Sequence, residues 1–274
     1  MGAGRAGSGL ARALRAAGVD VCGVHGHRDP GGPDRVSVGT LPDSLARSAV
    51  VLVTVRDSQI DDALRELLAG PLPPDAVVVH ASGSAEPAVL EDIRAAGHAA
   101  GTFHPLVPLA DPARAAEVLR GAFIGIDGDE PARAASRELA AKLGAQTLDI
   151  PPGEKARYHA AAVIVSNFPA VLLRMGEDVL VEAGIPLEQA RTAARALLST
   201  ASANLAGGDT ARSLTGPIVR GDVGTVQRHL AALASNPEAL AVYKSLSLAA
   251  LPIAREGGTS AAALAELERV LLVR

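Results

Sequence analysis

The chain has 274 residues, a formal net charge of -4, 48% hydrophobic residues and 20% charged residues. This is the composition of a globular protein, and the length suffices for two domains that each bury a core. Aromatic residues make up only 2%, so the chain has little with which to stack bases, and we expect no nucleic-acid partner. The only cysteine is Cys22, which excludes a disulfide framework and a thiolate metal cluster and fits a reducing cytoplasm.

Two stretches bear on export and membranes. Arginines at positions 5, 12 and 15 interrupt any apolar run at the N-terminus, so we expect no signal peptide. The longest apolar region, residues 160–173, contains Ser166, Asn167 and Pro169 and falls short of the ~20 residues of a membrane span. The sequence therefore predicts a cytoplasmic protein with no membrane contact.

The first half alternates short apolar runs with helical patterns. Residues 7–17 predict a helix that Gly18 ends, residues 29–34 are rich in turn formers, and the continuous apolar run 50–55 suits a strand buried on both faces. Further strands are expected at 19–24, 36–38, 77–80, 99–103, 122–126 and 146–150, and helices from 43 and at 57–68, 87–96, 112–119 and 131–143. This alternation predicts a doubly wound parallel sheet.

After Pro151 the pattern becomes entirely helical. Helices are expected at 155–183, 187–206, 223–234, 237–254 and 260–271. We therefore predict a domain over residues 1–151 and an all-helical C-terminal domain over residues 152–274.

The glycines Gly2, Gly4 and Gly7 have the spacing of a dinucleotide-binding turn. In such a turn the first glycine allows the tight bend, the second admits the pyrophosphate and the third lets the helix pack closely. Phosphate would lie at the helix N-terminus, against backbone groups of Arg5 and Ala6. A flexible glycine-rich start is the alternative, but the β/α series that follows favours the nucleotide site.

A strand should lead into that turn, yet Met1 directly precedes Gly2. We expect a longer chain to supply an apolar strand there. Without it, the neighbouring strands would lose a partner, and stability and cofactor affinity should suffer.

The residues after the second expected strand favour NADP over NAD. An NAD site usually offers a carboxylate about 20 residues beyond the turn, but the chain has His25, His27 and Arg28 there, with no acid before Asp29. Arg28 with one of the histidines could bind a 2′-phosphate. The alternative is an ordinary polar loop.

Ligands in open α/β sheets bind beyond the carboxyl ends of the strands. One such end carries Thr54, Val55 and Arg56, which we expect to line the cofactor. Another carries Ser82, Gly83 and Ser84, which would bind a substrate carboxylate or, alternatively, cap a helix.

Candidate proton donors lie at a third strand end and on the first C-terminal helix. His104 follows the strand 99–103, and a histidine titrates near neutrality. On the helix, Lys155, His159 and Ser166 share one stripe, with Asn167 on its flank. Lys155 or His159 could donate a proton and Asn167 could orient the substrate. The alternatives are a packed histidine, a solvated lysine and hydrogen bonding between helices.

Other chemistries find little support. The seven histidines are dispersed and no HExxH motif occurs, so we expect no metal site. A serine hydrolase is also not expected, because the chain lacks a G-x-S-x-G elbow.

Five segments together are more specific than the glycines: "HASGS", "GTFHPL", "GAFIGIDGD", "YHAAAVIVSNFPAVLL" and "LTGPIVRGDVGTVQRHL". Through them nearly the whole chain resembles the Rossmann-like family of domain of unknown function 2520. That family is similar to pyrroline-5-carboxylate reductase, ketopantoate reductase and β-hydroxyacid dehydrogenases. The resemblance implies a Rossmann-type domain followed by a helical dimerisation domain.

The resemblance also implies that His104, His159 and Asn167 border an interdomain cleft with the loop Thr215, Gly216 and Pro217, together with Arg220 and Asp222. Thr215 and Arg220 are then expected to contact substrate. The hydroxyacid dehydrogenases use a lysine and an asparagine one helical turn apart. This chain has Lys155 with His159 at that spacing, so their mechanism does not transfer directly.

These observations predict an NADP-dependent oxidoreductase, with NAD as the alternative cofactor. It would transfer hydride to a carbonyl or imine of a small, anionic metabolite and form a homodimer through its helical domain. The alternative is a nucleotide-binding sensor or scaffold that only dimerises.

Overall fold

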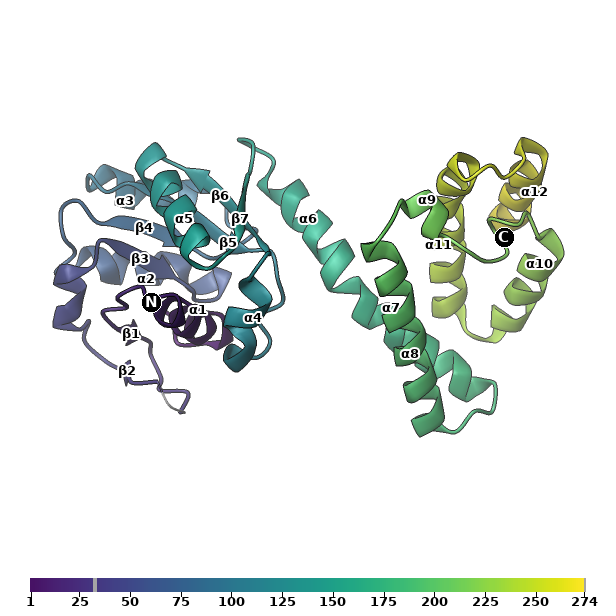
Figure 1. Cartoon of the computed structure of the whole chain (residues 1–274), viewed down its shortest axis with the longest axis horizontal. Helices are drawn as coiled ribbons and strands as arrows, with labels where there is room; N and C mark the ends of the chain where they lie inside the picture. Colours follow the sequence, from purple (N-terminus) through teal and green to yellow (C-terminus); the bar gives the residue numbers. More distant parts are fainter. Residues whose placement is uncertain (32–33, 274) are drawn as a thin grey trace. The chain divides into compact units, whose positions relative to one another are not determined.

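The computed structural model describes residues 1–31 and 34–273. By its internal contacts the chain divides into two compact units, Met1–Asn167 and Phe168–Arg274. Figure 1 shows strands and helices in the first unit and helices alone in the second. This is the predicted α/β fold followed by a helical region. Contacts assign helix α6 to the first unit, although the expected boundary lay before it.

The first unit contains a five-stranded sheet of order β3-β4-β5-β6-β7. Its strands are β3 (Val50–Val53), β4 (Val77–His80), β5 (Ala100–Pro105), β6 (Phe123–Gly128) and β7 (Gln146–Asp149). All neighbours pair in parallel except β5 and β6, which are antiparallel. After β5 the chain re-enters the sheet at the same end, where β5 finishes, and there Leu106 N donates to Phe123 O (2.8 Å). A β6 parallel to β5 would instead have needed a crossover connection that returns the chain to the end where β5 begins.

Helices cover both faces of this sheet. Alternate residues of β4 face opposite ways: Val79 packs with α1 (Arg5–Ala16), α4 (Ala115–Leu119) and α5 (Glu130–Lys142), and Val78 packs with α2 (Ile60–Leu68) and α3 (Glu91–Ala95). Both cores are aliphatic, and side chains such as Phe103, Ile60 and Ile93 are at most 1% exposed. The sheet is therefore held rigidly by apolar packing on both of its faces.

A second sheet contains only β1 (Val24–His25) and β2 (Val36–Ser37). The expected strand over 19–24 is confirmed only at its end. Residues 32 and 33 of the expected turn-rich stretch lie outside the described residues. Residues 19–25 and 50–52 line a cavity of about 370 Å³, and within the described part of the chain only Val24 and His25 of this segment pair with another strand.

Backbone at the start of the chain bridges the two sheets. Gly2 N donates to His25 O (2.7 Å), Met1 N to Leu52 O (2.5 Å) and Thr54 N to Met1 O (2.7 Å). The glycine turn is thereby fixed to the ends of β1 and β3.

Helix α6 (Lys155–Ser166) is followed after one residue by α7 (Phe168–Glu182). Pro169 lacks the N–H that would bond to the carbonyl of residue 165, which accounts for the interruption at Asn167. By length and composition, Lys155–Glu182 is long and apolar enough to cross a membrane, which corrects the expectation that this stretch is too short. Its first residue, however, is a buried, ion-paired lysine.

The second unit has two parts. Helices α7 and α8 (Leu187–Ala206) pack against each other. Helices α10 (Val223–Ala232), α11 (Pro237–Glu256) and α12 (Ala261–Leu272) enclose a separate apolar core. The short helix α9 (Thr210–Ser213) was not predicted. Large apolar side chains remain exposed on α7 and α8, among them Phe168, Val171, Leu197 and Leu205.

Candidate active site

The predicted glycine turn is built as a dinucleotide-binding turn requires. Gly2 has φ +104°, and a side chain on Gly7 would collide with Gly2 O and lie 2.5 Å from Thr54 Oγ1. A side chain on Gly4, in contrast, would meet no protein atom within 4 Å. Gly4 is the N-cap of α1 and provides no side chain to bond its first N–H groups. The turn therefore fits a pyrophosphate, which needs open space at Gly4 and free donors at the helix N-terminus.

The neighbouring cofactor candidates have different surroundings. Thr54 donates its hydroxyl to Gly2 O (2.8 Å), so it supports the turn rather than facing a ligand. His25 is buried, with Nδ1 3.0 Å from Ser37 Oγ. His27 and Arg28 are exposed beyond β1 and Arg56 beyond β3, while Val55 is half-buried.

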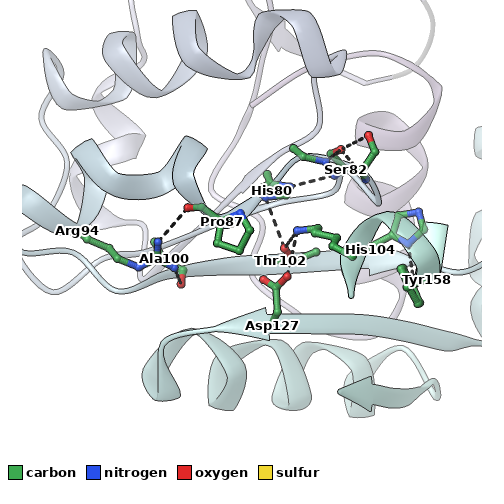
Figure 2. Close-up of polar contacts among 12 residues, drawn as sticks. His80, Ser82, Pro87, Arg94, Ala100, Thr102, His104, Asp127 and Tyr158 are labelled. Atoms are coloured by element: carbon green, nitrogen blue, oxygen red, sulfur yellow. Dashed lines mark hydrogen bonds and ion pairs between the residues drawn. The ribbon is translucent and has the colours of Figure 1, made fainter. Parts of the chain in front are cut away.

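Three polar side chains form a row across three neighbouring strands. His80 of β4 lies opposite Thr102 of β5, and Thr102 lies opposite Asp127 of β6. Directly paired residues point to the same face, and here that face continues the core of α2 and α3 through Val78 and Ala100. The polar row therefore begins where the apolar core ends. Figure 2 shows His80, Thr102 and Asp127 on neighbouring strands.

Lys155 of α6 contacts two members of this row. Its ammonium lies 3.1 Å from Asp127 Oδ2 and donates to Thr102 Oγ1, and its side chain is 2% exposed. Burial lowers the lysine pKa, and the carboxylate of Asp127 opposes that effect. Lys155 is thus half of a buried ion pair.

His80 is held as a neutral imidazole. Its Nδ1 accepts from Ser82 N (3.2 Å), and its Nε2 lies 3.5 Å from Thr102 Oγ1. Burial, and then the charge of Lys155, lower its pKa to about 4. His80 therefore connects the buried ion pair to the Ser82–Ser84 loop.

His104 and His159 meet at that loop. A side chain on Gly83 would lie 2.6 Å from His159 Cδ2 and 2.8 Å from His104 Nε2, so only glycine permits this approach. The two rings are 6.0 Å apart. Burial, and then His159, lower the pKa of His104 to about 4. Both predicted histidines therefore occupy one site.

Tyr158 orients His104. Its hydroxyl lies 2.7 Å from His104 Nδ1 (Figure 2), and burial raises the tyrosine pKa to about 12. A protonated tyrosine that donates to Nδ1 leaves the proton of a neutral imidazole on Nε2, facing the loop. Gly125 of β6 provides the room, because a side chain there would collide with the tyrosine hydroxyl.

The loop after β4 is held by its own bonds. Ser84 N and Ala85 N donate to Ser82 Oγ (3.2 and 2.9 Å), and Ser84 donates its hydroxyl to Asp57. Burial raises the pKa of Asp57, whereas the hydroxyls of Ser84 and Ser82 and the nearby His159 lower it. The net shift is downward, so the carboxylate form is favoured. Ser82 caps no helix, because the N-cap positions of the two helical segments that follow, Glu86 and Leu90, have no side-chain bond; its hydroxyl instead closes a turn within the loop.

The remaining predicted residues lie at the end of α6 and in the second unit. Asn167 ends α6, exposed and bonded to Ser166 Oγ (2.7 Å), about 12 Å along the helix from His159. Thr215 and Arg220 are exposed in the second unit, on the segment between α9 and α10. Asp222 caps α10 through Thr225 N (2.9 Å).

Sequence reasoning did not single out His80, Thr102, Asp127, Tyr158 or Asp57 as site residues. One signal was present: polar residues replace apolar ones at alternate positions, Val78 then His80 and Ala100 then Thr102. Such an alternation marks where one face of a strand leaves the core.

Comparison with known proteins supports the fold and shows a similarity to one family. Residues 122–250 match the family model described as "Domain of unknown function (DUF2520)". Over this segment the chain is similar to the DUF2520 family. No curated protein matches it.

Several solved structures resemble this chain over most of its length. A candidate NADP oxidoreductase from Bacteroides fragilis is 21% identical over 92% of this chain and 96% of its own, with a TM-score of 0.70. Pyrroline carboxylate reductase from Plasmodium falciparum, with NADP bound, is 14% identical over 98% and 96%, with a TM-score of 0.62. An imine reductase from Myxococcus stipitatus, in complex with NADP+, is 17% identical over 97% and 97%, with a TM-score of 0.55. These likenesses show a Rossmann-type fold with a helical C-terminal region.

Proposed function

We propose that the protein is an NADP-dependent oxidoreductase that reduces a carbonyl or imine of a small metabolite. One observation carries the proposal: the loop Thr54–Asp57 joins the glycine turn to the polar site. Thr54 bonds Gly2 at one end and Asp57 bonds Ser84 at the other. Three residues span at most ~11 Å, so an extended cofactor bound at the turn reaches the histidines.

Different residues of the chain would bind the cofactor and donate the proton. Gly4, Gly7 and the first N–H groups of α1, at Arg5 and Ala6, would hold the pyrophosphate, and the nicotinamide would supply the hydride. His159 is half-buried at Gly83 beside Asp57, where it could donate a proton to a forming alkoxide. The ion pair of Lys155 and Asp127 would hold the ends of β5 and β6 in place. The three structural neighbours described above are an NADP oxidoreductase candidate and two reductases, which supports this assignment.

We further propose that the protein is a homodimer. Helices α7 and α8 expose Phe168, Val171 and Leu197, which are 49%, 55% and 73% accessible. Apolar faces of this kind on adjacent helices are typical of an interface. A second copy of the chain would cover them symmetrically.

Arg28 is the residue expected to select NADP. It is exposed beyond β1, where no carboxylate precedes Asp29. Changing Arg28→Gln should weaken NADPH binding about tenfold, since one charge-assisted phosphate contact is lost, and leave NADH binding unchanged. Titration with each nucleotide, followed by nicotinamide fluorescence, checks this. Arg47→Gln, at an exposed arginine after β2, is the matched control, and equal losses for both nucleotides would refute the role of Arg28.

A further inference from the structure

The two ring nitrogens of His104 have different surroundings. Nδ1 lies 2.7 Å from the Tyr158 hydroxyl, and the two rings meet edge to face with their centres 5.6 Å apart. Nε2 faces Gly83 and has no hydrogen-bond partner among the described residues. It is also not one of the buried side-chain atoms that lack a partner, so Nε2 is open to solvent and free to bond a ligand.

The register of the sheet makes this pair possible. His104 lies two residues beyond Thr102 on β5, so it points to the same face, and it pairs directly with Gly125 of β6. Because Gly125 has no side chain, the phenol of Tyr158 on α6 can lie against this position beside His104. Gly125 does not have a positive φ, so its lack of a side chain serves this contact rather than a backbone turn.

The hydrogen bond between the two rings has one direction. Within the described part of the chain, the Tyr158 hydroxyl has no other partner, so a proton on His104 Nδ1 would leave the hydroxyl hydrogen without an acceptor. The hydroxyl therefore donates to Nδ1, and the neutral imidazole carries its proton on Nε2. Burial lowers the pKa of His104 to about 4 and raises that of Tyr158 to about 12, which keeps both groups in these forms at neutral pH. The other titratable groups nearby belong to His80, Lys155, His159, Asp57 and Asp127.

We propose that His104 and Tyr158 form a proton relay, in which His104 donates its Nε2 proton to the oxygen or nitrogen of the substrate and Tyr158 passes its hydroxyl proton to Nδ1. The inference rests on the proposed reductase function and assigns to His104 the role of donor considered above for His159. His104 is the catalytic residue, because it touches the substrate, and Tyr158 is the positioning residue behind it. The ring of His159 stands edge to face with His104 but has no hydrogen bond that orients it among the described residues.

The transfer balances for a ketone. The carbonyl carbon accepts hydride from the reduced nicotinamide, a C–H bond forms, and the π electrons of the C=O bond move to oxygen. The oxygen takes the proton of Nε2 as Nδ1 takes that of Tyr158, so the imidazole stays neutral and a tyrosinate remains. Tyrosinate is a weaker base than an alkoxide, so the transfer is favourable. Water then returns a proton to Nε2 while Tyr158 recovers its own from Nδ1.

Nitrogen NMR of the full chain, labelled with ¹⁵N-histidine and bound to NADP+, tests the hydrogen bond without turnover. We expect His104, assigned through His104→Gln, to show a protonated Nε2 and an unprotonated, hydrogen-bonded Nδ1 from about pH 6 to 9. Tyr158→Phe should abolish the hydrogen-bond signature at Nδ1. Tyr243→Phe is the matched control, because it removes the 2.9 Å contact with His229 Nδ1 in the second unit, and it should leave the His104 signals unchanged. A proton on His104 Nδ1 in the unmodified chain would overturn the relay.

The single-turnover rate of NADPH oxidation by a ketone, cyclopentanone first, tests the transfer itself. Tyr158→Phe should lower this rate about a hundredfold without changing the cyclopentanone concentration that gives half the maximal rate, and Tyr243→Phe should lower neither. The rate of the unmodified chain should stay level from about pH 6 to 9, whereas that of Tyr158→Phe should fall as the pH rises, because His104 must then be charged to donate. A merely structural role of Tyr158 would not alter this pH profile.

The outcomes separate the relay from the function it rests on. Ketone reduction by Tyr158→Phe at an undiminished rate, or with a level pH profile, would overturn the relay and leave the reductase standing. If no ketone or imine oxidises bound NADPH, the reductase falls and the relay with it. The NMR of the unmodified chain does not depend on whether Tyr158→Phe folds, so a wrong direction of the hydrogen bond is detected in every case.

Discussion

Changing Gly4→Ala should weaken NADPH binding about a hundredfold, or ~2.7 kcal/mol, while the protein folds normally. The added methyl meets no protein atom within 4 Å and so occupies the space that a pyrophosphate needs. The backbone at Gly4, with φ -71°, accepts alanine, and the loss of a glycine N-cap costs about 1 kcal/mol or less. Fluorescence titration and thermal unfolding measure the two effects separately.

Two further glycines make this experiment specific. Gly7→Ala should lose both cofactor binding and stability, because its methyl collides with Gly2 O. Gly176→Ala, in α7 with open space around it, should lose neither. If Gly4→Ala binds NADPH as tightly as the unmodified chain, the turn is not the pyrophosphate site.

Changing Asp127→Ala should lower the free energy of unfolding by about 3–5 kcal/mol, since it leaves the buried ammonium of Lys155 without its counter-ion. Lys155→Met removes the charge and keeps an apolar stem of similar length, so its cost should be smaller. The double variant should be more stable than Asp127→Ala alone. Urea unfolding of the three variants gives these values.

The coupling between the two residues decides the outcome of that series. If Asp127→Ala costs less than ~1 kcal/mol, or if the two losses simply add, Lys155 and Asp127 do not form the ion pair that organises the site.

The sequence predicted much of the fold because its periodicities are local. Strand β4 and helix α8 have the predicted bounds, residues 77–80 and 187–206. The short strand β1 was overestimated, because pairing depends on a neighbour that the pattern of residues 19–24 cannot report. The antiparallel direction of β6 likewise depends on where the chain returns after β5, which alternation alone does not reveal.

The site was predicted only in part, for a related reason. The strand-end rule found His104, and helical spacing placed Lys155 with His159. The row His80, Thr102 and Asp127 depends on the register between three strands, and register is not visible within any one of them. Lys155 looked like a solvated first-turn residue or a proton donor, and its burial follows from that same row.

Deuteride transfer tests the central claim most directly. The full chain is incubated with NADPH carrying deuterium at the reactive carbon and with a cyclic imine, 1-pyrroline, and the amine product is analysed by mass spectrometry. The proposed oxidoreductase predicts pyrrolidine with one deuterium, formed in proportion to the NADPH consumed. A protein that binds NADPH but forms no deuterated product with this imine, or with a panel of other imines and ketones, would contradict the claim and favour a nucleotide-binding sensor.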